Sequence, residues 1–200
     1  MAERAPGAAP PACRRCPRLV RARRENARAH PDWWNAPVPP ASDPASRVAI
    51  VGLAPGLRGA NRTGVPFTGD ASGGLLWPAL EWSGLAVGCA LRGAALSNAV
   101  LCWPPGNRPT SEEVRACNRY LQRFLVGKER VLALGGVAHA AVRRALGIPA
   151  KAAPFAHGAV AEVGGVRLVA SYHPSRLNVS TGRIDAAGLR QAVDLLTDST

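Results

Sequence analysis

A long glycine-rich loop directly after a short apolar segment constrains this chain more than any other feature. The segment 48–51 has the composition of a buried strand, and glycine and proline follow it at once. Glycines recur through residues 52–73, and the polar side chains between them are Asn61, Thr63, Thr68, Asp70 and Ser72. Glycine lets the backbone approach a ligand closely, and loops at strand ends carry binding sites. We therefore predict a ligand site in this loop.

Segments with strand character alternate with segments of helical periodicity along the rest of the chain. Strands are predicted at about 47–51, 94–101, 131–134 and 166–171, the last in a hairpin with 160–163. Helices are predicted at about 13–28, 73–85 with Pro78 in the first turn, 110–125, 137–146 and 185–197. Such alternation is typical of a parallel sheet covered by helices. We expect an α/β fold, a three-layer α/β/α sandwich around a central four-stranded, mainly parallel sheet.

Unusual polar segments follow three of these strands. They are the glycine loop, the segment beginning at Asn98 and the segment around His173. The carboxyl ends of parallel strands lie on one edge of a sheet, where ligands bind in open α/β folds. The three segments are therefore expected to form one pocket.

The chain is strongly basic, with a formal net charge of +12 and a pI near 11.1. Residues 1–30 hold eight arginines and only Glu3 and Glu25 as acids. A GC-rich genome explains arginine in place of lysine, but it does not explain the excess of base over acid. Arginine binds phosphate through a fork of donors and stays charged, so we favour nucleic acid as the partner.

Length and composition favour one domain. Residues 1–12 are rich in Ala, Pro and Gly and are expected to be a disordered arm, with a single domain over 13–200. No run of ~18 apolar residues and no secretion signal is present, so we expect no membrane association, a cytoplasmic location near the nucleoid and a monomer.

Five cysteines offer ligands for a metal. Cys13 and Cys16 have Cys-x-x-Cys spacing, and Cys102 and Cys117 are the other candidates. Spacing leaves two alternatives open, zinc or an iron–sulfur cluster, and the expected role is structural. Cys89 is expected to be a buried thiol.

Taken together, the motifs resemble the uracil-DNA glycosylase superfamily, and within it family 5, the type B enzymes. The motifs that carry the resemblance are the Cys-x-x-Cys pair, Trp33-Trp34, Gly52-Leu53-Ala54-Pro55-Gly56, residues 59–64, Pro66-Phe67-Thr68-Gly69-Asp70, Ser97-Asn98-Ala99-Val100, Cys102 with Pro104-Pro105, Cys117 and His173-Pro174-Ser175. The resemblance implies a [4Fe-4S] cluster on Cys13, Cys16, Cys102 and Cys117. It also implies excision of uracil, with hypoxanthine and related deaminated bases, from DNA by base flipping.

The resemblance also assigns roles to residues of the predicted pocket. Other branches of the superfamily carry an acid or an asparagine at the position of Leu53 or Ala54, and its absence here agrees with family 5. Asp70 then positions or deprotonates the water, or offsets positive charge on the sugar. Asn98 reads the base edge and His173 binds a base carbonyl as negative charge develops. The base-binding residues are Gly52, Leu53, Ala54, Gly56, Phe67, which stacks on the base, and Asn98.

A DNA-binding segment follows His173. Ser175, Arg176, Leu177 and Asn178 form it, with Arg62 from the glycine loop, and Leu177 or Arg176 is expected to fill the gap left by the extruded nucleotide. Lysines are scarce, so we expect a monofunctional enzyme without a Schiff base. The alternatives are a non-catalytic iron–sulfur or zinc module that binds nucleic acid, and a nucleotide-binding enzyme, for which the glycine loop lacks the usual phosphate signatures.

Overall fold

A six-stranded sheet forms the centre of the computed structural model, which describes residues 5–43 and 45–198. The strands follow the order β1-β5-β2-β6-β8-β7. Their bounds are β1 Ala41–Ser42, β2 Val48–Gly52, β5 Ala94–Asn98, β6 Arg130–Leu134, β7 Val160–Val163 and β8 Val166–Ser171. The four inner strands run parallel, and β1 and β7 pair antiparallel at the two edges.

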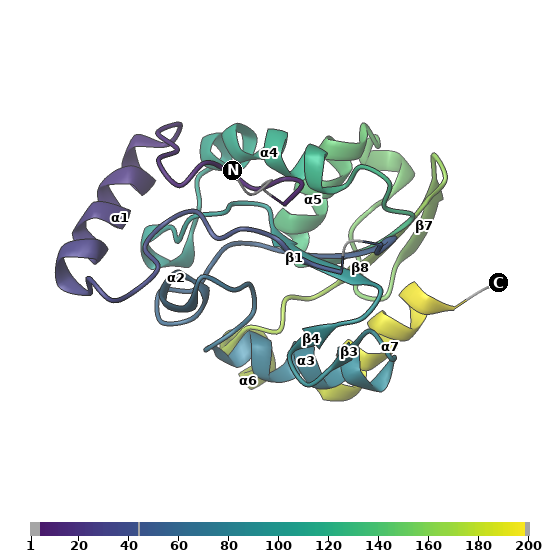
Figure 1. Cartoon of the computed structure of the whole chain (residues 1–200). Coiled ribbons are helices and arrows are strands. Elements are labelled where there is room, and N and C mark those ends of the chain that lie inside the picture. The colour runs from purple at the N-terminus through teal and green to yellow at the C-terminus, as the bar shows by residue number, and fades with distance from the viewer. Residues whose placement is uncertain (1–4, 44, 199–200) are drawn as a thin grey trace.

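Helices cover both faces of the sheet (Figure 1). Helices α4 and α5 lie on one face, and α3 and α7 lie on the other. The helices are α1 Pro17–Ala29, α2 Ala60–Thr63, α3 Ala71–Trp82, α4 Ser111–Phe124, α5 Gly136–Leu146, α6 Arg176–Ser180 and α7 Ala186–Thr197, with 3-10 turns at Pro105–Asn107 and Ala150–Ala152. A small hairpin, β3 Ala86–Val87 with β4 Ala90–Leu91, precedes β5. The predicted α/β fold with a mainly parallel sheet is confirmed.

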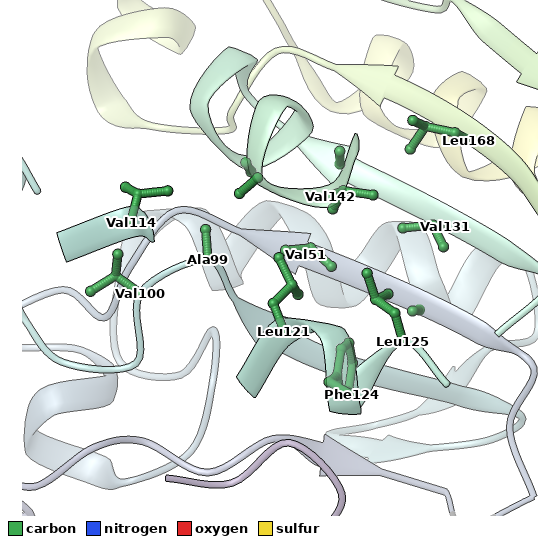
Figure 2. Packing of buried hydrophobic residues seen from close by; sticks show 14 of the residues in the cluster. Val51, Ala99, Val100, Val114, Leu121, Phe124, Leu125, Val131, Val142 and Leu168 are labelled. Carbon is green, nitrogen blue, oxygen red and sulfur yellow. The ribbon is translucent and has the colours of Figure 1, made fainter. Parts of the chain in front are cut away.

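Alternate residues of each inner strand enter different halves of the core, as the two-residue period of a strand requires. Val51, Val131 and Leu168 pack with Leu121 and Phe124 of α4 (Figure 2). Their sequence neighbours face α3 and α7, and these are Ile50, Leu132 and Val169. Both faces of the strands are apolar because both are covered, and this is why they read as continuous hydrophobic segments.

The strand register brings two of the polar segments together. In the parallel pairing of β2 with β5, Gly52 stands opposite Asn98. The ladder continues past the strand ends, where the N–H groups of Ala99 and Val100 donate to the carbonyls of Gly52 and Leu53 at 2.9 Å each. The first two segments therefore leave the sheet side by side.

Two expectations about the elements are corrected. The sheet has six strands rather than four, because the edge strands β1 and β7 extend the predicted four. Strand β1 has only two residues, too few to show a period in sequence. Pro78 lies in the interior of α3, not in its first turn, because that helix begins at Ala71.

The segment expected to form a disordered arm is only partly covered by the structure, since residues 1–4 lie outside the described ranges. Over residues 5–12 the structure differs from that expectation. Ala9 is buried against Leu101 and Tyr120. Arg23 donates to the carbonyl of Pro11 at 2.8 Å. Specific packing of small residues, which composition does not reveal, holds this segment against the domain.

Candidate active site

Segments from three strand ends line one cavity at the carboxyl edge of the sheet. Its lining residues are Ala54, Pro55, Gly56, Ala60, Phe67, Asp70, Ser72, Asn98 and His173. The structure therefore brings together Asp70, Asn98 and His173, as the sequence predicts. Gly52 is not among the lining residues, but it lies against two of the lining side chains, Phe67 and Asn98. Leu53 is not among the lining residues, and its carbonyl accepts from Val100.

Gly52 lets two side chains of the cavity approach the backbone. A Cβ atom there would lie 2.6 Å from Asn98 Oδ1 and 2.5 Å from Phe67 Cζ. The Asn98 side chain is 5% exposed and makes no hydrogen bond within the described residues. It does not cap the strand end, so its donor and acceptor are available to a ligand, as a buried amide requires.

Phe67 has an unusual backbone conformation, with a φ of 55°. A non-glycine residue rarely adopts a positive φ without support from its surroundings. Here Trp77 of α3 donates its indole N–H to the Phe67 carbonyl at 2.8 Å. Gly73 leaves room for that carbonyl, because a Cβ at Gly73 would lie 2.0 Å from the oxygen. The first turns of α3 thus hold the Phe67 ring over Gly52.

Asp70 uses its two carboxylate oxygens differently. Oδ1 accepts from the N–H of Gly73 at 3.0 Å and caps α3. Oδ2 lies over the loop backbone, because Cβ atoms at Gly56 and Gly59 would stand 3.0 and 2.5 Å from it. Asp70 can therefore cap α3 with Oδ1 and act in the cavity with Oδ2.

His173 follows β8 and faces Asp70 across the cavity. Burial lowers the pKa of His173, and the Asp70 carboxylate opposes this shift by favouring the charged form. The net direction is downward, so the imidazole is neutral at pH 7. The main chain of His173 is anchored, because its carbonyl accepts from Asn178 Nδ2 and from the N–H of Ser175, each at 2.8 Å.

The segment predicted to bind DNA forms the short helix α6. Ser175 caps it by accepting from the N–H of Asn178 at 3.3 Å, so both residues shape the segment. Arg176 and Leu177 are exposed, and the Leu177 side chain has 70% of its surface free. Exposure of a large apolar side chain is unusual at a purely structural position, and the role of Leu177 or Arg176 as a wedge stays a prediction. Arg62 is also exposed, on α2.

No specific site role was predicted from sequence for Trp77 or for three lining residues of the glycine loop, Pro55, Ala60 and Ser72. The three lie within the glycine loop, so their nearness to predicted site residues is a signal that could have found them. Trp77 lies within the helix predicted at about 73–85, but it was not singled out there as a site residue. Its hydrogen bond to Phe67 depends on how α3 docks, and no sequence pattern indicates it.

A second cavity collects the four cysteines predicted as ligands. Cys13, Cys16, Cys102 and Cys117 all line it, together with apolar side chains. Within the described residues, no three His, Cys, Asp or Glu side chains already stand close enough to hold a metal ion. Burial raises the pKa of Cys102 and of Cys117 to about 12 each. Thiolates are costly there without a positive centre, so the donor set and its apolar surroundings fit a bound cluster or metal.

Cys89 differs from expectation, because it is exposed rather than buried. It lies between β3 and β4, in the turn of the small hairpin. Of the apolar residues around it in sequence, Leu85 and Ala86 are buried in the core and Leu91 packs against the core while partly buried. Cys89 is therefore the one cysteine of the chain outside the four-cysteine cavity.

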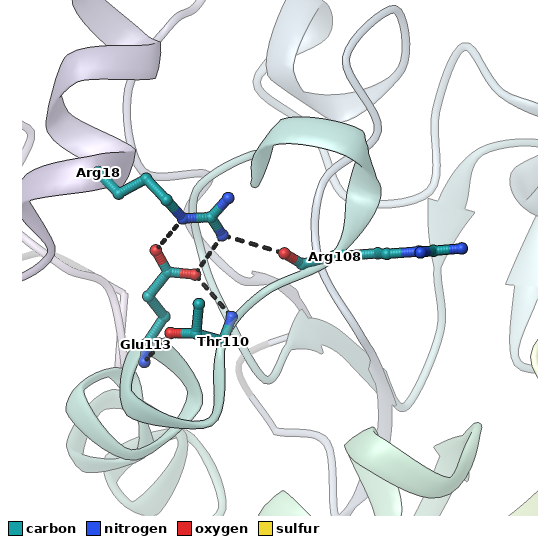
Figure 3. Close-up of polar contacts among 4 residues, drawn as sticks. All are labelled: Arg18, Arg108, Thr110 and Glu113. Atoms are coloured by element: carbon teal, nitrogen blue, oxygen red, sulfur yellow. Dashed lines mark hydrogen bonds and ion pairs between the residues drawn. The ribbon is translucent and has the colours of Figure 1, made fainter.

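A polar clasp joins α1, which begins directly after Cys16, to α4, which carries Cys117 (Figure 3). Arg18 of α1 donates to both oxygens of Glu113 on α4, at 2.8 and 2.7 Å, and to the carbonyl of Arg108 at 3.0 Å. Glu113 also accepts from the N–H of Thr110 at 2.8 Å and completes a capping box. Burial alone raises the pKa of Glu113, but the hydrogen bonds from Arg18 and Thr110 outweigh it and the pKa is lowered. The clasp sets α1 against α4 beside Cys16 and Cys117.

A membrane-crossing helix, which needs a long stretch of low charge, is not found among residues 5–43 and 45–198.

Comparison with known proteins agrees with this geometry. Residues 39–197 match the family described as the Uracil DNA glycosylase superfamily. The chain is 45% identical over 196 residues to a type-5 uracil-DNA glycosylase of Pyrobaculum aerophilum, covering 90% of this chain and 86% of that protein. It is 46% identical over 190 residues to a type-5 uracil-DNA glycosylase of Thermus thermophilus, covering 86% and 87%. A type-5 uracil-DNA glycosylase of Mycobacterium leprae is 43% identical over 198 residues, covering 88% and 86%.

Proposed function

Because this chain belongs to the uracil DNA glycosylase superfamily, we propose that it is a uracil-DNA glycosylase that hydrolyses the N-glycosidic bond of uracil in DNA. We include hypoxanthine and related deaminated bases in its range. The observation that carries the proposal is that Asp70, Asn98 and His173, from three separate segments, line one cavity with Phe67.

Base recognition is assigned to the inner part of the cavity. A base within a duplex is unreachable, so the nucleotide rotates out of the stack before it binds. Phe67 stacks on the base, and the Asn98 amide, which makes no hydrogen bond to the described part of the chain, offers a donor and an acceptor to its edge. The backbone of Gly52, Ala54 and Gly56 surrounds the base, whereas Leu53 supports the loop through its hydrogen bond with Val100, just after β5.

Bond breaking leaves negative charge on the base and positive charge on the sugar, and the cavity carries a group for each. Neutral His173 donates a hydrogen bond to a base carbonyl as charge develops, which is an electrostatic contribution of the oxyanion-hole type. Asp70 offsets the positive sugar and orients or deprotonates the attacking water through Oδ2, while Oδ1 stays on the helix.

The products are a free base and an abasic site. No lysine lines the cavity, since Lys128 binds the main chain of Ser46 and Lys151 lies in a 3-10 turn beyond α5. A Schiff base, and the strand cleavage that follows from it, is therefore not part of the proposal.

We assign the four-cysteine cavity to a [4Fe-4S] cluster held by Cys13, Cys16, Cys102 and Cys117. The cluster would act structurally, since its ligands lie on the segment before α1, at the start of α1, after β5 and on α4. It would hold α1 and residues 5–12 against the domain alongside the clasp. Absorbance near ~400 nm in the purified protein tests this, with zinc as the colourless alternative. Cys117→Ser is expected to remove the absorbance and Cys89→Ser, at the exposed cysteine, is expected to keep it.

The function is tested by excision from single- and double-stranded oligonucleotides that carry uracil, hypoxanthine or xanthine. We expect uracil release, with strand breaks only after added alkali. No release of uracil from either form of DNA would refute the proposal, and breaks without alkali would refute the monofunctional mechanism. Release of uracil alone would confine the base range to uracil.

A further inference from the structure

A row of arginines runs along the outer face of α1, apart from the cavity. Arg21, Arg24 and Arg28 are spaced three and four residues apart and therefore share one face of the helix. All three are exposed, and with Arg14 they line a shallow surface depression in which Glu25 is the only acid. We call Arg21, Arg24 and Arg28 the α1 stripe.

The stripe has no polar partner among residues 5–43 and 45–198. The opposite face of α1 is the packed one, where Leu19 and Ala22 are buried. Among the described residues, none of the three arginines makes an ion pair or a side-chain hydrogen bond. Three unpaired cations within a few turns repel one another, so a structural role for the stripe is poorly supported.

The stripe is connected to the rim of the cavity. The chain after α1 returns to α2, where Trp34 N–H donates to the carbonyl of Arg62 at 3.0 Å. Asn35 holds the end of α1 by donating to the carbonyl of His30 at 2.7 Å. In Figure 1, α1 and α2 lie at the same end of the molecule, and α1 is farther from the central sheet than α2. Helix α2 also carries Ala60 of the cavity lining. A DNA strand that leaves the cavity past Arg62 therefore reaches α1 next.

We propose that the α1 stripe binds consecutive backbone phosphates of the DNA that flanks the flipped nucleotide. This inference rests on the proposed function, because it requires DNA as the partner. The seven residue steps from Arg21 to Arg28 span about 10 Å of helix, which matches about three phosphate steps of one strand at about 3.4 Å each along the duplex axis. These contacts are independent of base sequence and add affinity rather than specificity.

Salt-dependent binding to an undamaged duplex tests the proposal without requiring catalysis. The variant Arg21→Gln/Arg24→Gln/Arg28→Gln keeps the helix, because glutamine is a good helix former. If each arginine neutralises one phosphate, the slope of log K against log salt becomes less steep by about 2.7, which is three contacts at about 0.9 each. Arg14 is left unchanged because it adjoins Cys13.

The matched control removes the same charge elsewhere. The control variant Arg92→Gln/Arg144→Gln/Lys151→Gln changes three exposed cations. Arg92 precedes β5, and Arg144 and Lys151 lie at or after the end of α5, at the edge of the sheet opposite the carboxyl ends of the parallel strands. Its slope is expected to equal that of the wild type. A change of about 1 or less in the stripe variant, or an equal change in the control, would overturn the proposal. Failure of the proposed function would show separately, as wild-type protein that binds duplex but releases no uracil.

Discussion

Replacing Gly59 by alanine should disturb the position of Asp70 more than the stability of the fold. A Cβ at Gly59 would lie 2.5 Å from Asp70 Oδ2 and 3.0 Å from its Cβ and Cγ, where ordinary contact begins at 3.4 Å. The shortfall is 0.9 Å at the oxygen and 0.4 Å at the carbons. Rotation of the carboxylate alone does not relieve contacts with Cβ and Cγ, so the whole side chain must move.

The displacement acts on both functions of Asp70. If Oδ1 leaves Gly73, the loss of the cap costs about 1 kcal/mol of the free energy of unfolding. A misplacement near 1 Å costs a reacting group about 10²-fold in rate. We therefore expect Gly59→Ala to remain folded and to lose about 10²-fold in single-turnover uracil excision, measured beside thermal unfolding.

Two other glycines make the test quantitative. A Cβ at Gly56 would stand 3.0 Å from Oδ2 alone, so Gly56→Ala should lose less than Gly59→Ala. Gly74, inside α3, has nothing within 4 Å of its Cβ, so Gly74→Ala should keep the rate and gain up to about 1 kcal/mol. Near-wild-type excision by Gly59→Ala, or a larger loss in Gly56→Ala, would refute the assignment of Oδ2 to the reaction.

The other predictions concern the groups around this carboxylate. The pKa of His173 is lower in the folded protein, so the unfolded chain binds more protons below about pH 6.5. The free energy of unfolding should therefore fall as the pH decreases from about 6.5 to the pKa of the folded state. In a pH series of thermal melts, His173→Ala should reduce this decrease in stability. Asp70→Asn, which can still cap α3, should lower the pKa of His173 further in an NMR titration and reduce single-turnover excision by about 10²-fold or more; an unchanged pKa would contradict the coupling. Trp77→Phe leaves the Phe67 carbonyl without its donor and should cost about 1–3 kcal/mol in denaturant unfolding, and a neutral result would show that Phe67 holds its conformation alone. Glu113→Gln weakens the clasp between α1 and α4 and should speed the loss of ~400 nm absorbance on exposure to a chelator, whereas equal rates would separate the clasp from the cluster.

The position of α1 links the second cavity with the proposed DNA surface. One face of this helix lies over the four-cysteine cavity through Leu19 and Arg23, while the stripe is on the other. The clasp holds α1, and with it the stripe, against α4, and the proposed cluster would add a tie to the segment after β5. Such a cluster would have a physical consequence for binding, because a rigid row of cations loses less entropy on contact with phosphates.

Local sequence chemistry was enough to predict several elements correctly. The helix predicted at about 110–125 is confirmed as α4, and the structure adds a capping box between Thr110 and Glu113, three residues apart, which needs no contact with distant segments. The four inner strands are apolar on both faces, and their alternation with helices identifies a parallel sheet. From that topology alone, the meeting of Asp70, Asn98 and His173 at one edge could be predicted.

Tertiary packing decided what depends on the approach of distant segments. Only the docking of α3 shows that Trp77 supports Phe67 and that Asp70 divides its oxygens between a helix and a cavity. Only burial shows that residues 5–12 pack on the domain and that Cys89 is exposed. Sequence therefore determined the fold class, the elements and which segments meet, because periodicity and capping are local. The environment of each side chain was decided by tertiary structure, because burial and charge depend on residues far away in the chain.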